Sequence, residues 1–242
     1  MRGGRTRHPW ETARARALER ILRTAEVRPR SVLDYGCGDG FTGEYLQRAL
    51  GARRLLGFDI QLTEVQCRAL SGAEVTYAND WASAGPASYD LCLLCDVIEH
   101  VADDEALLRI VRERMTDDGR VLITVPAFQL LFTHHDRALK HFRRYTLAQL
   151  ERVSILAEFE LEASGYLFGS LLPGRGASKV LQALKPRTDD DFGIGAWSGS
   201  TLVTRALETA LDWDNAVLLS LASRGIKLPG LSAWALCKQR RS

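Results

Sequence analysis

The chain has 242 residues, of which 46% are apolar and 26% charged, so it is long enough for one large domain with its own core. Its 32 basic and 30 acidic residues leave a formal net charge of +2, which does not suggest a nucleic-acid-binding protein. The basic residues that cluster in MRGGRTRH, residues 1–8, are typical of a solvated tail, and contact with nucleic acid or anionic lipid is a less frequent use of such an arm.

Five cysteines are scattered along the sequence, which shows no signal peptide and no apolar run of about 20 residues. The odd number and the scatter predict reduced thiols in a cytoplasmic protein without a membrane-spanning segment. Cys92 and Cys95 have CxxC spacing but lie in the apolar run DLCLLCDV. In a strand these two side chains would face opposite sides, which argues against a shared metal.

Helical and strand patterns alternate from residue 10 onward. Helices are expected at residues 10–25, 41–50, 63–70, 103–115 and 146–159. Strands are expected at residues 31–36, toward the end of 51–60, and at 73–80, 88–97, 117–127 and 160–168. This alternation predicts an α/β fold, with a doubly wound, mostly parallel seven-stranded sheet and helices on both faces.

The alternation stops at residue 169 and strand character returns at residue 231. Residues 169–230 contain glycine, proline, a polar stretch and an apolar helix candidate around 201–222, so we expect a helical insertion before the last strand. A cap over the ligand pocket is its expected role, with a dimer face or a membrane-surface patch as alternatives. The expected division is an arm and helix (1–29), an α/β domain (30–168), the insertion (169–230) and the last strand (231–242).

Ligands of doubly wound sheets bind at the carboxyl ends of the strands, and the polar candidates of this sequence gather there. The first strand runs into the alternate glycines Gly36, Gly38 and Gly40, where a backbone without Cβ atoms allows close approach of a ligand. The other candidates at strand ends are Asp34, Asp59, Asn79, Asp80, Trp81 and Asp96.

The glycine loop does not suit a dinucleotide well. The dinucleotide fingerprint is GxGxxG, whereas here the spacing is GxGxG and Phe41 stands where the third glycine would be. Asp39, inside the loop, would repel a pyrophosphate. A cofactor with a positively charged end would meet no such repulsion.

The segment VLDYGCGDG, residues 32–40, resembles motif I of the class I S-adenosylmethionine-dependent methyltransferases. The resemblance continues through GFDI, YAND, YDLCLLCDVIEHV and DDGRVLITVP, and covers roughly residues 30–168. It implies a Rossmann-like methyltransferase fold, with S-adenosyl-L-methionine as cofactor and S-adenosyl-L-homocysteine as product.

The resemblance also implies roles for the residues at the strand ends. Asp34 orients the loop and reaches the ligand's ammonium through water, unless it serves only the backbone of the loop. Asp59 binds the ribose hydroxyls, unless it is only a turn former at the strand end. Asn79 and Asp80 lie beside the adenine, unless Asp80 only caps a helix. Trp81 stacks on the ring or belongs to the core. Asp96 closes the methionyl side.

The segment after the fifth strand, residues 128–145, is rich in histidine and arginine and should border the acceptor pocket. His135 and His141 are the candidate catalytic bases, since a histidine paired with a carboxylate can work near neutral pH. Adjacent arginines suit an anionic acceptor. The candidate substrate-binding residues are His100, Asp136, Arg143, Arg144 and Tyr145.

Two other uses of this segment remain open at this point. It could be a structural lid in which Asp136 binds Arg143 or Arg144. Its histidines could bind a metal, but their spacing matches no standard ligand set, so no metal is expected.

The prediction for function is methyl transfer to a small organic acceptor, such as a natural product, sugar or lipid precursor. The form DVIEH after the fourth strand resembles small-molecule and lipid methyltransferases rather than enzymes that methylate the amines of nucleic-acid bases. Oxygen is the first choice of acceptor atom, with nitrogen or carbon open. The alternatives are a nicotinamide-dependent oxidoreductase and a catalytically silent binding or scaffold protein.

Overall fold

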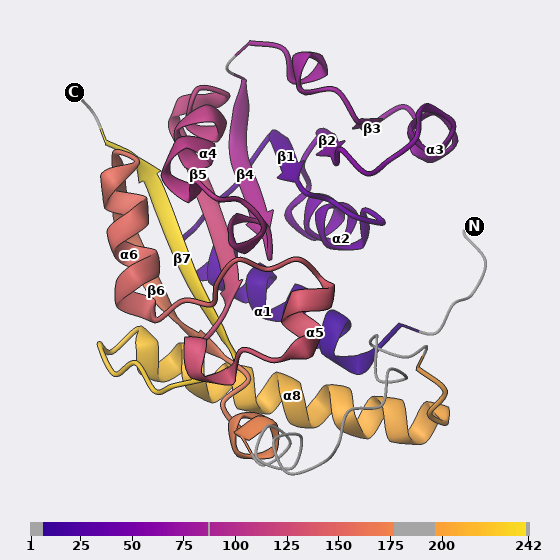
Figure 1. Cartoon of the computed structure of the whole chain (residues 1–242). Helices are drawn as coiled ribbons and strands as arrows, with labels where there is room; N and C mark the ends of the chain where they lie inside the picture. Colours follow the sequence, from indigo (N-terminus) through magenta and orange to yellow (C-terminus); the bar gives the residue numbers. More distant parts are fainter. Residues whose placement is uncertain (1–6, 87, 177–196, 241–242) are drawn as a thin grey trace.

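The computed structural model describes residues 7–86, 88–176 and 197–240, which form a seven-stranded sheet between two layers of helices (Figure 1). The strand order is β3-β2-β1-β4-β5-β7-β6, and only β7 runs antiparallel to its neighbours. The strands are β1 (Ser31–Tyr35), β2 (Arg54–Phe58), β3 (Val75–Ala78), β4 (Tyr89–Cys95), β5 (Met115–Pro126), β6 (Phe159–Leu167) and β7 (Ser232–Gln239).

Three short 3₁₀ turns accompany the α-helices, and each follows a strand: β3, β4 or β5. The α-helices are α1 (Pro9–Thr24), α2 (Phe41–Leu50), α3 (Glu64–Leu70), α4 (Asp104–Arg112), α5 (His134–Ala138), α6 (Leu147–Leu156) and α8 (Thr201–Ala222). The 3₁₀ turns are η1 (Trp81–Ala84), η2 (Ile98–His100) and η3 (Gln129–Leu131). Thr146 caps α6, because its side chain accepts the backbone N–H of Gln149.

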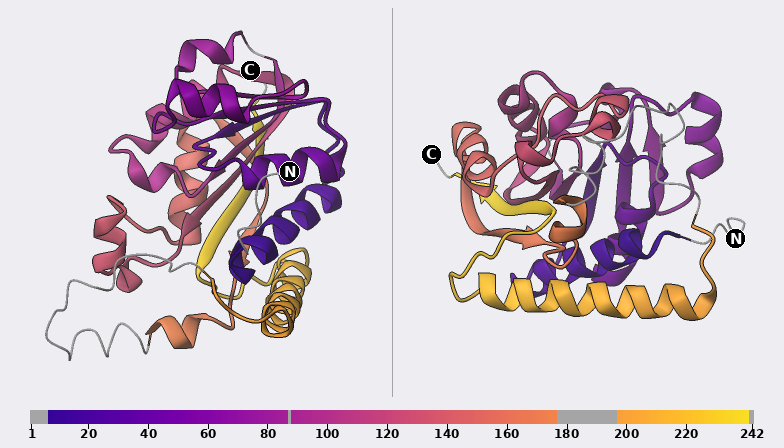
Figure 2. Two further views of the ribbon diagram at one scale, coloured as in Figure 1. Left: turned by 90° about the vertical axis from the view of Figure 1, so that its right-hand side faces the viewer. Right: turned by 60° about the horizontal axis from the view of Figure 1, so that its bottom comes forward.

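Each face of the sheet carries its own apolar core (Figure 2). On one face, α1 contributes Leu18 and Leu22 and α8 contributes Leu211. On the other face, α4 and α6 pack through side chains such as Leu108 and Leu150. The central strands are apolar on both sides because both of their faces are covered. The sheet therefore exposes mainly its strand ends.

The predicted fold class is confirmed, and the differences concern single elements. β5 already begins at Met115, where it pairs with Tyr89, and the register of the two strands shifts after this pair. α4 therefore ends at Arg112, before the expected end at residue 115. The loop after β5 contains a short helix, α5, that the sequence pattern does not predict. α8, from the expected insertion, packs along α1 and over β6, while residues 177–196 lie outside the described residues.

Candidate active site

The loop after β1 has the backbone conformation that its glycines allow. Gly36, Gly38 and Gly40 have φ angles of 72°, 55° and 79°, in the left-handed region that side chains disfavour. A Cβ on Gly40 would overlap the Tyr77 hydroxyl, and one on Gly36 would lie 2.6 Å from Val97. A Cβ on Gly38 would meet no protein atom within 4 Å. Gly38 therefore presents bare backbone to open space at the strand ends.

Asp59, directly after β2, reaches across to this loop. Its Oδ2 accepts the backbone N–H of Gly38 at 3.0 Å, and its Oδ1 accepts that of Gln61 at 2.8 Å. Parallel pairing of Tyr35 with Phe58 brings the two strand ends together. The carboxylate thus lies at the edge of the open space beside Gly38, as expected from the strand order.

Asp34 lies beneath the loop and is 2% exposed. Burial raises the pKa of its carboxyl to about 7, against the opposing effects of a hydrogen bond from the Gly43 backbone and of the Arg14 charge. Its Oδ2 has no hydrogen-bond partner among the described residues. A buried carboxyl with a free oxygen can accept a hydrogen bond from a cationic ligand group.

Asp96 directly follows β4, has a φ of 58° and forms an ion pair with Arg14 of α1. Thr124 also donates to Asp96, at 3.4 Å. The Arg14 side chain is 13% exposed and its guanidinium lies over the Trp10 ring. Arg14 is not among the site residues predicted from the sequence. The available signal was its place on the apolar stripe of α1, between Trp10 and Leu18.

The residues that follow β3 make mostly internal contacts. Asn79 donates through Nδ2 to the Leu62 carbonyl at 2.9 Å. Asp80 is exposed and caps η1 by accepting the Ala82 N–H. The Trp81 ring packs edge-on against Tyr35 and Phe58, with centroids 5.0 and 5.1 Å away. Trp81 thus lies against the core, which is one of its two expected positions.

Beyond Asp96, η2 and the loop before α6 bring Glu99, His100 and His141 together. The His100 and His141 rings meet edge-on, with centroids 4.5 Å apart. Glu99 is fully buried, and neither of its carboxylate oxygens has a hydrogen-bond partner among the described residues. Burial, together with the Asp96 charge, raises the pKa of Glu99 well above its usual value. Burial and the nearby His141 lower the pKa of His100.

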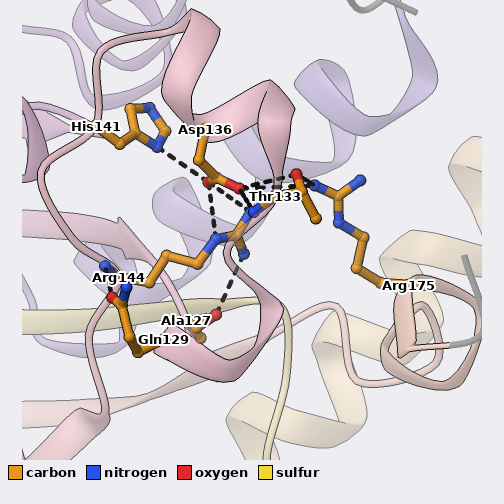
Figure 3. A network of polar contacts seen from close by, with 7 residues as sticks. All are labelled: Ala127, Gln129, Thr133, Asp136, His141, Arg144 and Arg175. Atoms are coloured by element: carbon orange, nitrogen blue, oxygen red, sulfur yellow. Dashed lines mark hydrogen bonds and ion pairs between the residues drawn. The ribbon is translucent and has the colours of Figure 1, made fainter. Parts of the chain in front are cut away.

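Asp136 is the centre of a buried polar network under this cluster (Figure 3). Its carboxylate accepts hydrogen bonds from Arg144 Nε at 2.8 Å, from the Thr133 N–H at 2.8 Å and from His141 Nδ1 at 3.1 Å. Burial alone would raise the pKa of Asp136, but the hydrogen bonds from His141 and Arg144 outweigh burial and hold it well below the usual range. Arg144 also donates to the Ala127 carbonyl at 3.2 Å, so its guanidinium is held by both Asp136 and the protein backbone.

Two of the expected acceptor-side residues do not join this network. Arg143 donates to Asp104 Oδ2 at 3.0 Å and to the backbone carbonyls of residues 101 and 102. The Tyr145 hydroxyl is buried and donates to the same Asp104 oxygen at 2.7 Å. Both side chains therefore fasten the loop to the start of α4.

The two candidate bases differ in their surroundings. His141 has a carboxylate partner in Asp136, whereas half-buried His135 forms no bond with a carboxylate among the described residues. Burial and the Arg175 charge lower the pKa of His135. A separate cavity of about 730 Å³ lies between α1, α8 and the sheet, lined among others by Arg20, Lys227 and Trp234. It contains none of the predicted site residues.

The sheet order, the glycine loop and the strand-end carboxylates define a Rossmann-like methyltransferase fold of class I. Residues 9–164 match the family described as "Methyltransferase domain", and the chain belongs to that family. The expected family is thereby confirmed, and with it the expected cofactor, S-adenosylmethionine.

Curated relatives are about 30% identical to this chain over the segments that align. Ubiquinone biosynthesis O-methyltransferase of Neisseria meningitidis serogroup C is 30% identical over 116 residues, which cover 44% of this chain and 48% of that protein. (S)-Coclaurine N-methyltransferase of Thalictrum flavum subsp. glaucum is 30% identical over 114 residues, which cover 44% of this chain and 32% of that protein. The chain spans about half, or less, of the length of these relatives.

Solved structures share the fold at low sequence identity. YcgJ of Bacillus subtilis has a TM-score of 0.56 and 16% identity, with 94% of this chain and 99% of that chain covered. The 1,6-didemethyltoxoflavin-N1-methyltransferase of Burkholderia thailandensis, solved with S-adenosylhomocysteine, has a TM-score of 0.52 and 23% identity, with 64% and 71% covered. Within the described residues, no helix combines the length and apolar character that a bilayer crossing requires.

Proposed function

We propose that the protein transfers a methyl group from S-adenosylmethionine to a small organic acceptor. The observation that carries this proposal is the bare backbone of Gly38 facing open space, with Asp59 hydrogen-bonded to it and Asp34 buried beneath the loop with a free oxygen. The group that such a site suits is flat or extended, cationic at one end and rich in hydroxyls at the other. S-Adenosylmethionine fits this description and supplies the methyl group as a sulfonium.

The contacts favour a definite orientation of the cofactor. We assign the ribose end to Asp59, and the adenine end to the edge formed by Asn79 and Asp80. The methionyl end belongs with Asp34 and Asp96, whose carboxylates suit an ammonium. Arg14, in an ion pair with Asp96, adds a cation that suits the methionyl carboxylate.

The acceptor side of the proposed site is the cluster beyond Asp96, formed by Glu99, His100 and His141. Oxygen remains our choice of acceptor atom, because an imidazole held by a carboxylate can take a hydroxyl proton. The Asp136 bond favours His141 over His135 for a role near the acceptor. Arg143 and Arg144 both donate to protein partners, which leaves fewer of their N–H groups for an anionic acceptor.

Three other expectations stay proposals. They are the division of the chain at residues 29, 168 and 230, a cytoplasmic location, and a capping role for the insertion. α8, the described helix of the insertion, packs along α1 and over β6.

Calorimetric titration tests the cofactor. Wild-type protein and Asp59→Ala are titrated with S-adenosylmethionine, S-adenosylhomocysteine and NAD. The proposal expects micromolar binding of the first two ligands, weakened about 10- to 100-fold in the variant, since hydrogen bonds to a charged group contribute about 1.5–3 kcal/mol. Binding of NAD alone would favour an oxidoreductase. Cofactor binding without turnover across a panel of hydroxyl and amine acceptors would favour a silent binding protein.

A further inference from the structure

We propose that Glu99, His100 and His141 form a binding site for a divalent transition-metal ion beside the acceptor position. One carboxylate oxygen and one nitrogen from each ring lie within 4.8 Å of one another. Zn²⁺-type ions bind such atoms at about 2.0–2.2 Å, so small side-chain rotations bring all three to a common ion. The ligands come from two segments, η2 and the loop before α6, which is why the spacing within either segment matches no standard metal motif.

Glu99 gives the first independent reason for an ion. Its side chain is fully buried and both carboxylate oxygens lack hydrogen-bond partners among the described residues. A buried carboxylate without partners is costly, and a bound cation removes that cost. The two guanidinium groups whose charges act on Glu99 already have carboxylate partners, Arg14 in Asp96 and Arg144 in Asp136.

His141 gives the second reason. Its Nδ1 lies 3.1 Å from Asp136 Oδ1, and Figure 3 shows the other ring nitrogen pointing away from that carboxylate. A carboxylate that accepts from one ring nitrogen of a histidine fixes the tautomer and leaves the other nitrogen free to bind a metal. Asp136 itself accepts hydrogen bonds from Arg144 and Thr133, which fix its carboxylate and, through it, the orientation of the His141 ring.

The ligand set selects the kind of ion. Two imidazoles and one carboxylate suit Mn²⁺, Fe²⁺, Co²⁺ or Zn²⁺, whereas Mg²⁺ and Ca²⁺ prefer oxygen ligands throughout. Three protein ligands leave coordination positions open, as in catalytic rather than structural sites. His100 is exposed, so the ion can enter from solvent.

This inference rests on the proposed function for its role in the reaction. An acceptor hydroxyl that binds the ion loses its proton to solvent, because the ion lowers the hydroxyl pKa. The oxygen keeps the electron pair, which forms the new carbon–oxygen bond while the carbon–sulfur bond breaks and S-adenosylhomocysteine leaves. His141 is then a metal ligand rather than the base.

Cobalt titration tests the site without any acceptor. Full-length protein, dialysed against a chelator, is titrated with Co²⁺ and followed by its visible absorption, and Mn²⁺ binding is followed by electron paramagnetic resonance. The expected result is one ion per chain with a micromolar dissociation constant. His100→Gln and Glu99→Gln should weaken binding at least tenfold. His134→Ala is the matched control, because His134 is exposed on the same loop as His141 and pairs only with Arg137 in the described structure.

Each outcome separates the metal site from the cofactor site. His100→Gln changes an exposed side chain, so it tests the site even if the buried Glu99 variant unfolds at a lower temperature. Millimolar or absent Co²⁺ binding by wild type, or binding that His100→Gln leaves unchanged, would overturn the metal site. S-Adenosylhomocysteine binding, measured on the same chelated sample, reports on the proposed function independently.

Discussion

Arg14 of α1 forms an ion pair with Asp96 at the end of β4, 82 residues further along the chain. The guanidinium also lies within electrostatic reach of Asp34 and Glu99. One cation from the first helix therefore stands among three carboxylates at the strand ends. Its charge opposes the rise in the pKa of Asp34 and Glu99 that burial and the neighbouring acids cause, and it supplies the positive charge that the proposed methionyl carboxylate needs.

Substitution of Arg14 is expected to weaken cofactor binding. Arg14→Ala should raise the dissociation constant of S-adenosylhomocysteine about 10- to 100-fold, in line with the loss of one charge-assisted contact. Arg14→Lys should recover part of the affinity, since it restores the charge but not the planar fork. Calorimetry measures the affinity, and thermal unfolding of the free proteins shows how much of the change is structural.

Arg16, two residues further along α1, provides the control for Arg14. It pairs with Asp212 at 2.7 Å and with Glu208 at 3.3 Å, both on α8, and is 41% exposed. Arg16→Ala should lower the free energy of unfolding by about 0–1 kcal/mol, as for an exposed ion pair, and leave cofactor affinity unchanged. Equal losses of affinity in the Arg14 and Arg16 variants would contradict a specific role for Arg14.

Two glycines of the loop should respond differently to the same substitution. Gly38→Ala places its methyl group in open space, so it should cost about 1–2 kcal/mol for the left-handed backbone and still fold. Its methyl should block the cofactor and abolish measurable S-adenosylhomocysteine binding. Gly40→Ala also displaces the Tyr77 side chain and breaks its 2.7 Å hydrogen bond to Glu44. The Gly40→Ala protein should therefore unfold at a clearly lower temperature than wild type. Cofactor binding that survives in Gly38→Ala would place the ligand elsewhere.

The cofactor half of the site could be predicted from sequence because its residues follow from strand order. The glycines lie in one short loop, and Asp59 meets Gly38 because parallel strands end at the same edge of the sheet. Alternation of strands and helices predicts a doubly wound parallel sheet, in which consecutive strands end at the same edge. The contact is thus a consequence of local patterns plus one topological rule.

The remaining contacts depend on packing that no short pattern encodes. Arg14 meets Asp96 only after α1 packs onto the sheet, so its charge appears in the sequence as one more basic residue on a helix. Arg143 and Arg144 are neighbours in an irregular loop, yet one binds Asp104 and the other Asp136. The path of that loop decides which arginine faces the site, and no periodicity predicts this path. Trp81 could equally stack on a ligand or pack on Tyr35, and only the folded chain shows the latter contact.

Asp34 is expected to give the protein a pH-dependent stability. Its pKa in the folded protein is about 7, above the ordinary value of 3.8, so the folded state favours the neutral acid. Stability relative to Asp34→Asn should therefore be greatest below pH 4 and fall as pH rises to about 7. The full fall corresponds to at most about 4 kcal/mol. Urea unfolding of both proteins from pH 4 to pH 8 measures this difference, and a difference that stays constant over the range would contradict a raised pKa.

The buried Asp136 network is expected to respond to substitution more strongly than any exposed ion pair. Asp136→Asn leaves the Arg144 guanidinium buried without its carboxylate, so the free energy of unfolding at pH 7 should fall by about 3–5 kcal/mol. Because the pKa of Asp136 is lowered in the folded protein, its stabilisation is present above pH 4 and is lost as the pH falls below that value. Urea unfolding should therefore show the same difference in free energy of unfolding between wild type and variant at pH 7 and at pH 5. This difference should become smaller only below pH 4. Glu162→Gln, which breaks a more exposed pair with Arg120, serves as control and should cost about 0–1 kcal/mol. Equal costs for the two variants would show that Asp136 contributes no more than an exposed carboxylate does.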